Sequence, residues 1–248
     1  QLAGISVWFV LVSICLSLLS SVLISYRWSL LLIKKPKLKD VLVFIKSSLA
    51  ASFYGLFFPS AVAGDVLKWV IIDEKYPEIA KTKLLGSVIL DRFVGMSMFM
   101  FSGTVMLFVA RFRGVTIPWL VELLFWGVFL GCIVFYILLA AGGLSKIFRF
   151  KWFKKFENVA ELVEKNNVKQ VFKCVMVSFV SELFWILQMW FFSWYFGAGL
   201  SVMSIFIFLP VISMILVLPI SFAGFGAREQ LYLFFFGGMA RSPESLLL

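Results

Sequence analysis

A long apolar run breaks at Phe58-Pro59-Ser60-Ala61-Val62-Ala63-Gly64-Asp65-Val66-Leu67-Lys68, which passes from a proline through small residues to charge. A second stretch near the C-terminus follows the same plan: Leu218-Pro219-Ile220-Ser221-Phe222-Ala223-Gly224-Phe225-Gly226-Ala227-Arg228-Glu229. Both have a proline, three residues, Ala-Gly, three residues and then a base. Two broken hydrophobic segments in corresponding halves of a membrane protein predict a transport site where the halves meet.

The composition indicates a membrane protein. Of the 248 residues, 62% are hydrophobic and 15% are charged, whereas soluble domains are about half apolar and about a quarter charged. Six or so spans of about 20 residues would use up the chain. We therefore expect one all-helical transmembrane domain over residues 1–248. Both ends fall in or beside apolar runs, and we expect the natural chain to continue beyond them.

The residue types exclude several classes of catalytic and metal-binding site. The chain has no histidine, which excludes Ser-His-Asp hydrolysis, histidine-ligated zinc and histidine proton relays. Cys15, Cys132 and Cys174 are far apart in the sequence, so neither a metal cluster nor a redox pair is indicated. We predict no metal and no cofactor. The net charge of +10 lies in loops beside apolar runs, which favours anionic lipid headgroups over nucleic acid as partners.

Long apolar runs predict the membrane crossings. They occupy residues 5–33, 84–109, 117–141 and 171–196, and a further run starts at residue 230. A group of bases is assigned to the loop after the first run: Arg27, Lys34, Lys35, Lys37 and Lys39. By the positive-inside rule, that end of the first crossing is cytoplasmic.

The segments 41–63 and 201–226 carry the two broken motifs. Lysine-bearing loops flank 41–63 on both sides, so a crossing there would place one of these loops outside. A re-entrant pair of half-helices would keep both in the cytoplasm, and we favour this interpretation over a spanning helix. The first half then makes an odd number of crossings, which predicts an inverted repeat with halves at about 1–142 and 171–248.

Residues 143–170 join the two halves and are rich in lysine and arginine, with aromatic residues between the bases. An interfacial helix on an anionic leaflet would have this composition. A solvated cytoplasmic loop that sets the topology would also have it. Both interpretations stay open.

The prolines and glycines of the motifs would shape the backbone. Pro59 and Pro219 end or kink their helices because proline lacks an N–H and clashes with the preceding turn. Gly64, Gly224 and Gly226 permit positive φ angles and close backbone approach. Exposed N–H groups at the start of a half-helix then form a natural anion site.

The charged residues of the motifs are candidates for binding. Lys68 and Arg228 could complete an anion site, and arginine offers bidentate geometry to phosphate. Asp65 and Glu229 would pair with these bases or orient them. Structural pairing alone is the alternative role for both carboxylates.

Three charged residues lie inside predicted spans. Asp91 and Arg92 are adjacent, so they point about 100° apart around a helix and cannot simply neutralise each other. Glu182 shares one helical face with Ser178, Ser181, Trp185 and Gln188. A carboxylate near the bilayer centre costs about 2.5–3.5 kcal/mol on insertion scales, which makes it a functional candidate. A protonated glutamate that only joins helices is the alternative.

Three ordered motifs carry a family resemblance: FPSAVAGDVLKW at 58–69, DRFVG at 91–95 and LPISFAGFGARE at 218–229. Together they resemble the lysylphosphatidylglycerol synthase transmembrane family, also called flippase-like membrane proteins. Ala63 and Phe225 stand where that family usually has glycine, and Lys68 stands where it has arginine. Lys68 keeps the positive charge of the motif, but alanine and phenylalanine permit less close approach of the backbone to a ligand than glycine does.

The resemblance implies an integral protein of the cell membrane that moves a lipid or lipid-linked molecule between leaflets. In two-part family members, a separate cytosolic acyltransferase-like domain that uses aminoacyl-tRNA carries the transfer reaction. Nothing in this sequence could be that domain, so we do not predict an enzyme. A homo-oligomer and a lipid-modifying enzyme are candidate protein partners.

The leading hypothesis is therefore a translocase for an anionic or phosphate-bearing lipid. The candidate headgroup site consists of Pro59, Gly64, Asp65, Lys68, Asp91, Arg92, Glu182, Pro219, Gly224, Gly226, Arg228 and Glu229. One alternative is a non-catalytic membrane subunit, or an embedded enzyme, of aminoacyl-lipid or lipid-linked glycan synthesis. A scaffold that transports nothing is the other.

Overall fold

The computed structural model describes residues 5–55, 57, 61–115, 117–140, 168–217, 226–241 and 246. Within these ranges it has eight helices and no strand. The helices are α1 (Val7–Leu32), α2 (Leu38–Gly55), α3 (Ala61–Lys75), α4 (Lys81–Phe112), α5 (Trp119–Ala140), α8 (Val168–Tyr195), α9 (Val202–Val217) and α10 (Ala227–Phe236). The predicted all-helical fold is confirmed.

Four helices are long and apolar enough to cross a membrane: α1, α4, α5 and α8. A helix of about 20 apolar residues spans the hydrocarbon core and satisfies its own backbone groups there. The ends of the four helices match those of the four predicted spans to within three residues, because hydropathy alone dictates such segments. Most of the predicted basic segment 143–170 lies outside the described residues, and α8 begins at Val168.

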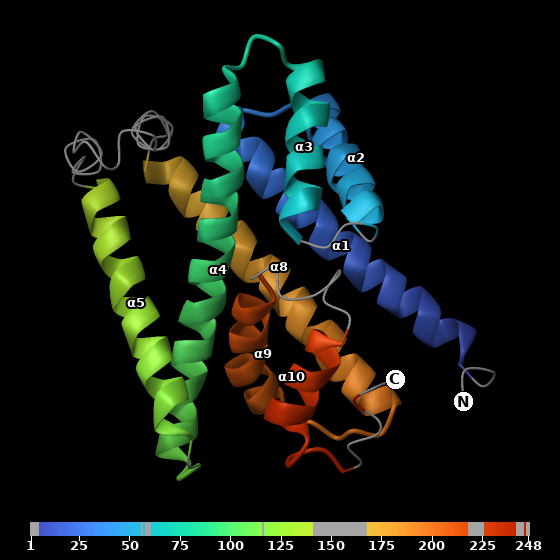
Figure 1. Cartoon of the computed structure of the whole chain (residues 1–248), viewed down its shortest axis with the longest axis vertical. Helices are drawn as coiled ribbons and strands as arrows, with labels where there is room; N and C mark the ends of the chain where they lie inside the picture. The colour runs from blue at the N-terminus through green and yellow to red at the C-terminus, as the bar shows by residue number, and fades with distance from the viewer. Residues whose placement is uncertain are drawn as a thin grey trace.

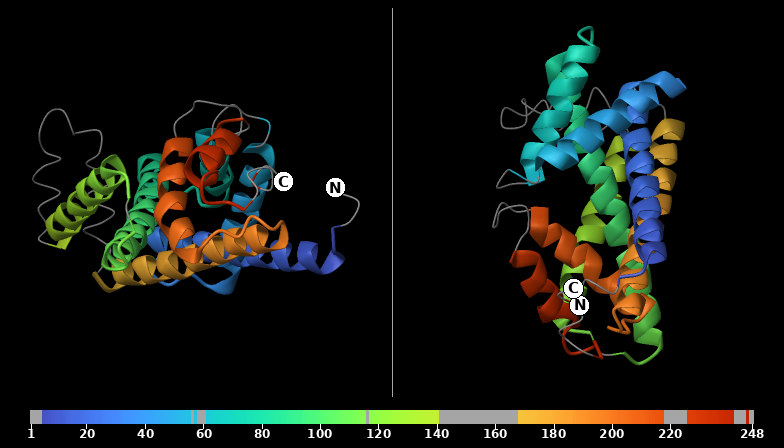
Figure 2. Two further views of the ribbon diagram at one scale, coloured as in Figure 1. Left: turned by 90° about the horizontal axis from the view of Figure 1, so that it is seen from below. Right: turned by 90° about the vertical axis from the view of Figure 1, so that its right-hand side faces the viewer.

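α1 and α8 lie side by side over most of their length (Figures 1 and 2). Serines permit this close packing, because small side chains let two helix backbones approach. Ser20 is buried and donates a hydrogen bond to the main-chain oxygen of Ser181, at 3.1 Å. At one end of the pair, the ring of Phe9 stacks on Tyr195 with centroids 3.8 Å apart.

α2 and α3 pack together at the upper end of Figure 1. Gly64 lies within α3 and lets the two helices come close, since an added Cβ would lie 3.2 Å from the main-chain oxygen of Ala51. Of its two predicted uses, Gly64 therefore serves close approach, and positive φ belongs to Gly226 instead. Pro59 lies outside the described residues.

α9 and α10 form a second pair at the lower end of Figure 1, where Phe208 of α9 packs against Phe236 of α10. The α9 helix continues through Pro210. Because proline has no N–H, Pro210 cannot donate the usual helical hydrogen bond to the main-chain oxygen of Phe206. At Gly103, α4 comes close to that carbonyl, because a Cβ there would lie 3.1 Å from the Phe206 oxygen.

The two helix pairs approach the middle of the molecule from opposite ends (Figure 1). α3 starts at Ala61 and α10 starts at Ala227, so both helices begin toward the middle and run outward. Re-entry into a membrane and an inverted repeat stay predictions.

Candidate functional site

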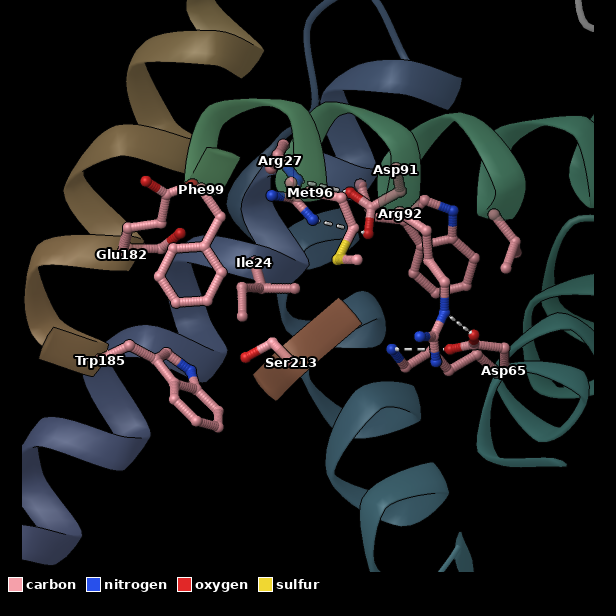
Figure 3. A pocket seen from close by; sticks show the side chains of 15 residues that line it. Ile24, Arg27, Asp65, Asp91, Arg92, Met96, Phe99, Glu182, Trp185 and Ser213 are labelled. Carbon is pink, nitrogen blue, oxygen red and sulfur yellow. Dashed lines mark hydrogen bonds and ion pairs between the residues drawn. The ribbon is translucent and has the colours of Figure 1, made fainter. Parts of the chain in front are cut away.

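A cavity of about 390 Å³ lies among α1, α3, α4, α8 and α9 (Figure 3). Three bases and three acids line it: Arg27, Lys68, Arg92, Asp65, Asp91 and Glu182. The remaining wall is largely apolar and includes Ile24, Met96, Phe99 and Trp185. Lys68, Asp65, Asp91, Arg92 and Glu182 were all predicted from the sequence, and the fold brings these five into one chamber.

Arg27 and Asp91 form a buried ion pair between α1 and α4. The Nε and Nη2 atoms of Arg27 donate to the two carboxylate oxygens of Asp91, at 2.7 and 2.9 Å. Arg27 Nη1 donates to Ser178 of α8, at 2.9 Å. Such a bidentate pair is strong and directional, so it fixes three spanning helices relative to one another.

Gly95 makes room for the Arg27 guanidinium. A Cβ at this position would lie 2.8 Å from Arg27 Nη1. Because Gly95 is one turn after Asp91 on α4, the glycine leaves the guanidinium free to lie flat against the helix beside its carboxylate. Asp91 and Gly95 therefore lie on one face of α4, the face that meets Arg27 of α1.

Asp65 holds two bases at the opposite side of the cavity from Glu182 (Figure 3). Arg92 Nε donates to one carboxylate oxygen of Asp65, and Lys68 Nζ lies 3.4 Å from the other. Asp91 and Arg92 therefore point to different partners, one toward α1 and the other toward α3, as helix geometry predicts. Two bases and one acid leave this triad with a net charge of +1.

Glu182 is the third carboxylate of the cavity and is 7% exposed. Its Oε2 atom accepts a hydrogen bond from Ser102 of α4, at 3.3 Å. Its buried Oε1 atom has no hydrogen-bond partner within the part of the chain that the structure describes. A buried polar atom without a partner is costly, so its persistence calls for a functional reason.

A second cavity, also of about 390 Å³, lies between α8 and α10. Gln188, Arg228, Glu229 and Tyr232 line it, and Trp185 lines both cavities. Arg228 is exposed, whereas Glu229 is half-buried and its Oε2 atom lacks a partner among the described residues.

The predicted site residues are thus divided between two chambers. Arg228 and Glu229 line the second cavity and not the first. Gly226 caps the start of α10 with φ of 78° and Gly64 lies at the α2–α3 contact. Pro59, Pro219 and Gly224 lie outside the described residues.

Sequence analysis missed Arg27, which it assigned to the basic loop after the first span. The structure places it inside α1, 5% exposed. The signal was its position, because Arg27 lies within the apolar run and is separated from the lysines at 34 and 35 by six residues. Ser102 and Ser178 were not candidates either, since only the packing of three helices brings them to charged partners.

A family model described as the lysylphosphatidylglycerol synthase TM region matches residues 1–248, the whole chain. The chain belongs to this family. Membership and the apolar helices together establish a multi-pass integral membrane protein. No curated protein matched in a search of such proteins, and a search of the solved structures found no match either.

In this lysylphosphatidylglycerol synthase TM region, the first cavity combines a cationic part with an apolar part. The Asp65–Arg92–Lys68 triad presents two cationic donors, and Ile24, Phe99 and Trp185 offer apolar surface within the same chamber. Such a chamber suits a molecule with an anionic head and an apolar body.

Proposed function

We propose that this protein is a lipid translocase of the cell membrane, which moves an anionic or phosphate-bearing lipid, or a lipid-linked molecule, between leaflets. The observation that carries the proposal is the net positive triad of Asp65, Lys68 and Arg92 in a chamber between apolar helices. A charge left in such a place is expensive and marks a substrate pathway by default.

The triad suits a phosphate. Lys68 and Arg92 both contact the Asp65 carboxylate, and a phosphodiester with one negative charge would balance the net charge of +1 on this triad. Guanidinium and ammonium groups are the usual phosphate ligands of proteins, and charge-assisted hydrogen bonds of this kind are about twice as strong as neutral ones. Asp65 would then hold both bases in place between one headgroup and the next.

The apolar wall favours a lipid over a free anion. Ile24, Met96, Phe99 and Trp185 would contact the glycerol and the first methylenes of a lipid whose phosphate lies on the bases. A free inorganic anion would leave this surface unused. Trp185 stands between the two cavities, so a headgroup moving on toward Arg228 would pass its ring.

The opposed helix pairs support movement between leaflets. α3 and α10 begin toward the middle from opposite ends, and helix starts present N–H groups and partial positive charge. In many transporters two such broken elements form the midplane site of an inverted repeat. We infer the same layout here, with α2–α3 and α9–α10 re-entering from opposite faces. We also infer that the chain itself catalyses no chemical transfer.

The test is leaflet exchange of fluorescent phosphatidylglycerol in vesicles that hold the full-length protein. Exchange by the wild type and loss of it in Arg92→Gln would support the proposal. We expect the variant to lose roughly tenfold or more, because a hydrogen bond to a charged group contributes about 1.5–3 kcal/mol. Glu122→Gln, which breaks the exposed pair with Arg111, is the control and should exchange normally. Equal exchange in protein-free vesicles would contradict the proposal.

A further inference from the structure

We propose that Glu182 is a proton-binding site that takes up one proton with each anionic headgroup, so that a proton gradient drives the translocation. The inference deepens the proposed function and rests on it. It assigns an energy source to the first cavity and a distinct role to the one cavity carboxylate that forms no ion pair within the described residues.

The bonding of Glu182 differs from that of its neighbours. Asp91 meets a guanidinium through both oxygens, and Asp65 meets two bases. Glu182 is at least as buried as either of them, yet it meets only the Ser102 hydroxyl through one oxygen, while its other oxygen is unpartnered. A carboxylate buried without a cation takes up a proton rather than keep its charge.

The cations that face Glu182 are already engaged. On α1, Arg27 gives its donors to Asp91 and Ser178. On α3 and α4, the neighbouring charges are Asp65, Lys68, Asp91 and Arg92, which pair among themselves and with Arg27. The described residues of α9 include no titratable side chain, and the charges of α10 line the second cavity, beyond Trp185.

The charge of the whole cavity links the proton to the headgroup. Three bases and three ionised acids would make the empty cavity neutral, and a phosphodiester would then bring an uncompensated negative charge. With Glu182 protonated, the cavity carries +1 and the phosphodiester neutralises it. Because charges interact strongly where water is scarce, anion binding favours proton binding, and by reciprocity the proton favours the anion.

The surroundings suit a proton better than a metal cation. Hard cations such as calcium and magnesium take about six or more oxygen ligands, whereas one serine hydroxyl contacts Glu182. The described residues contain no group of three or more acidic, cysteine or histidine side chains that could hold a metal ion.

The first experiment measures proton uptake. Short-chain phosphatidylglycerol is titrated into the full-length protein in weakly buffered detergent with a pH indicator, while calorimetry records binding. We expect up to one proton per lipid bound by the wild type and by Glu122→Gln, and none by Glu182→Gln. Uptake that is unchanged in Glu182→Gln, or binding without uptake in the wild type, would overturn the proposal.

An infrared difference spectrum guards against a variant that fails to fold. Binding of an ether-linked phosphatidylglycerol, which has no ester carbonyl, should add the carbonyl band of a protonated carboxylic acid to the spectra of the wild type and Glu122→Gln but not to that of Glu182→Gln. Absence of this band under conditions of full binding would overturn the proposal. A requirement for sodium in place of proton uptake would overturn it as well.

The second experiment separates this proposal from the proposed function. Vesicles with an imposed gradient of about one pH unit should accumulate anionic lipid in one leaflet by up to roughly tenfold, and Glu182→Gln should only equilibrate it. Exchange by the wild type that ignores the gradient would overturn proton coupling and leave the translocase intact. Lipid-linked proton uptake without any exchange would overturn the translocase, and with it proton-driven transport, and would leave only the proton-binding role of Glu182.

Discussion

The two broken motifs share a spacing and yet place their bases differently. In the first, α3 begins at Ala61, so Lys68 lies two turns into the helix and pairs with Asp65. In the second, α10 begins at Ala227, so Arg228 lies in the first turn and is exposed. The first motif thus presents a base held within an ion-pair network, and the second presents a base at a helix start.

One position explains the difference. Gly226 adopts φ of 78° immediately before α10, a conformation that glycine takes without strain. The residue at the same distance from the first proline is Val66, and a β-branched side chain resists positive φ. The first helix therefore continues through this position and the second starts after it. Equal spacing between two motifs does not establish equal geometry.

The largest expected effect comes from breaking the buried network. Asp91→Ala would leave the Arg27 guanidinium buried without its carboxylate, and such a loss costs about 3–5 kcal/mol. Arg228→Ala removes an exposed base of the second motif and should change stability by less than about 0.5 kcal/mol. Unfolding of both variants in the same detergent would measure the contrast. Equal destabilisation would contradict the comparison.

The next prediction concerns the loss of stability when Gly226 is replaced. Gly226→Ala should cost about 1–2 kcal/mol, because alanine is strained at positive φ. Val66→Gly should cost about 0.5–1 kcal/mol through helix propensity alone, since no left-handed conformation is needed there. Thermal unfolding of the pair would sharpen the comparison. If Val66→Gly proved the more harmful, the two positions would not differ as described.

Gly95→Ala should have a more local effect on stability, about 1–3 kcal/mol, which is typical of overpacking. The added methyl would meet Arg27 Nη1 at 2.8 Å and force the guanidinium to shift from Asp91. The double-mutant cycle with Asp91→Ala measures this coupling. Additive losses would show that Gly95 does not position Arg27.

The smallest effect lies outside the membrane spans, at the contact between Asp40 and Tyr76. Burial, and then the hydrogen bond to Asp40, raise the pKa of Tyr76 to about 12. The pKa of Tyr76 in the folded protein exceeds the ordinary tyrosine value of about 10. The contribution of Tyr76 to the free energy of unfolding is therefore complete below about pH 10 and is lost as the pH rises toward its pKa in the folded protein. Tyr76→Phe should remove this loss of stability from unfolding curves measured at alkaline pH, and it should leave lipid exchange unchanged. An unchanged alkaline curve would contradict this origin.

The spans and the inward carboxylates could be predicted from the sequence. Hydropathy identified α1, α4, α5 and α8, and a charge inside an apolar helix indicated Asp91 and Glu182. Arg27 was missed because a base near lysines was taken as a topology signal. Its pairing with Asp91 depends on which faces of α1 and α4 meet, and only tertiary packing decides that.

The sequence predicted only in part which of the site residues lie together. The sequence predicted Lys68 and Arg228 as equivalent ligands, but they line separate cavities that share Trp185. The equivalence rested on spacing, whereas the placement depends on where each helix starts. Asp65 and Arg92 come from different helices, and their contact follows from the packing of α3 against α4.

The central claim is that a lipid headgroup enters the first cavity, and cysteine protection tests it most directly. Ser213→Cys on α9 would introduce a thiol into the cavity wall, in a protein whose Cys15, Cys132 and Cys174 are replaced by serine or alanine. Ser201→Cys, which lies outside that cavity just before the same helix, is the control. Short-chain phosphatidylglycerol should slow maleimide labelling at position 213 and not at 201. Labelling at 213 that is unaffected by saturating lipid would contradict the account.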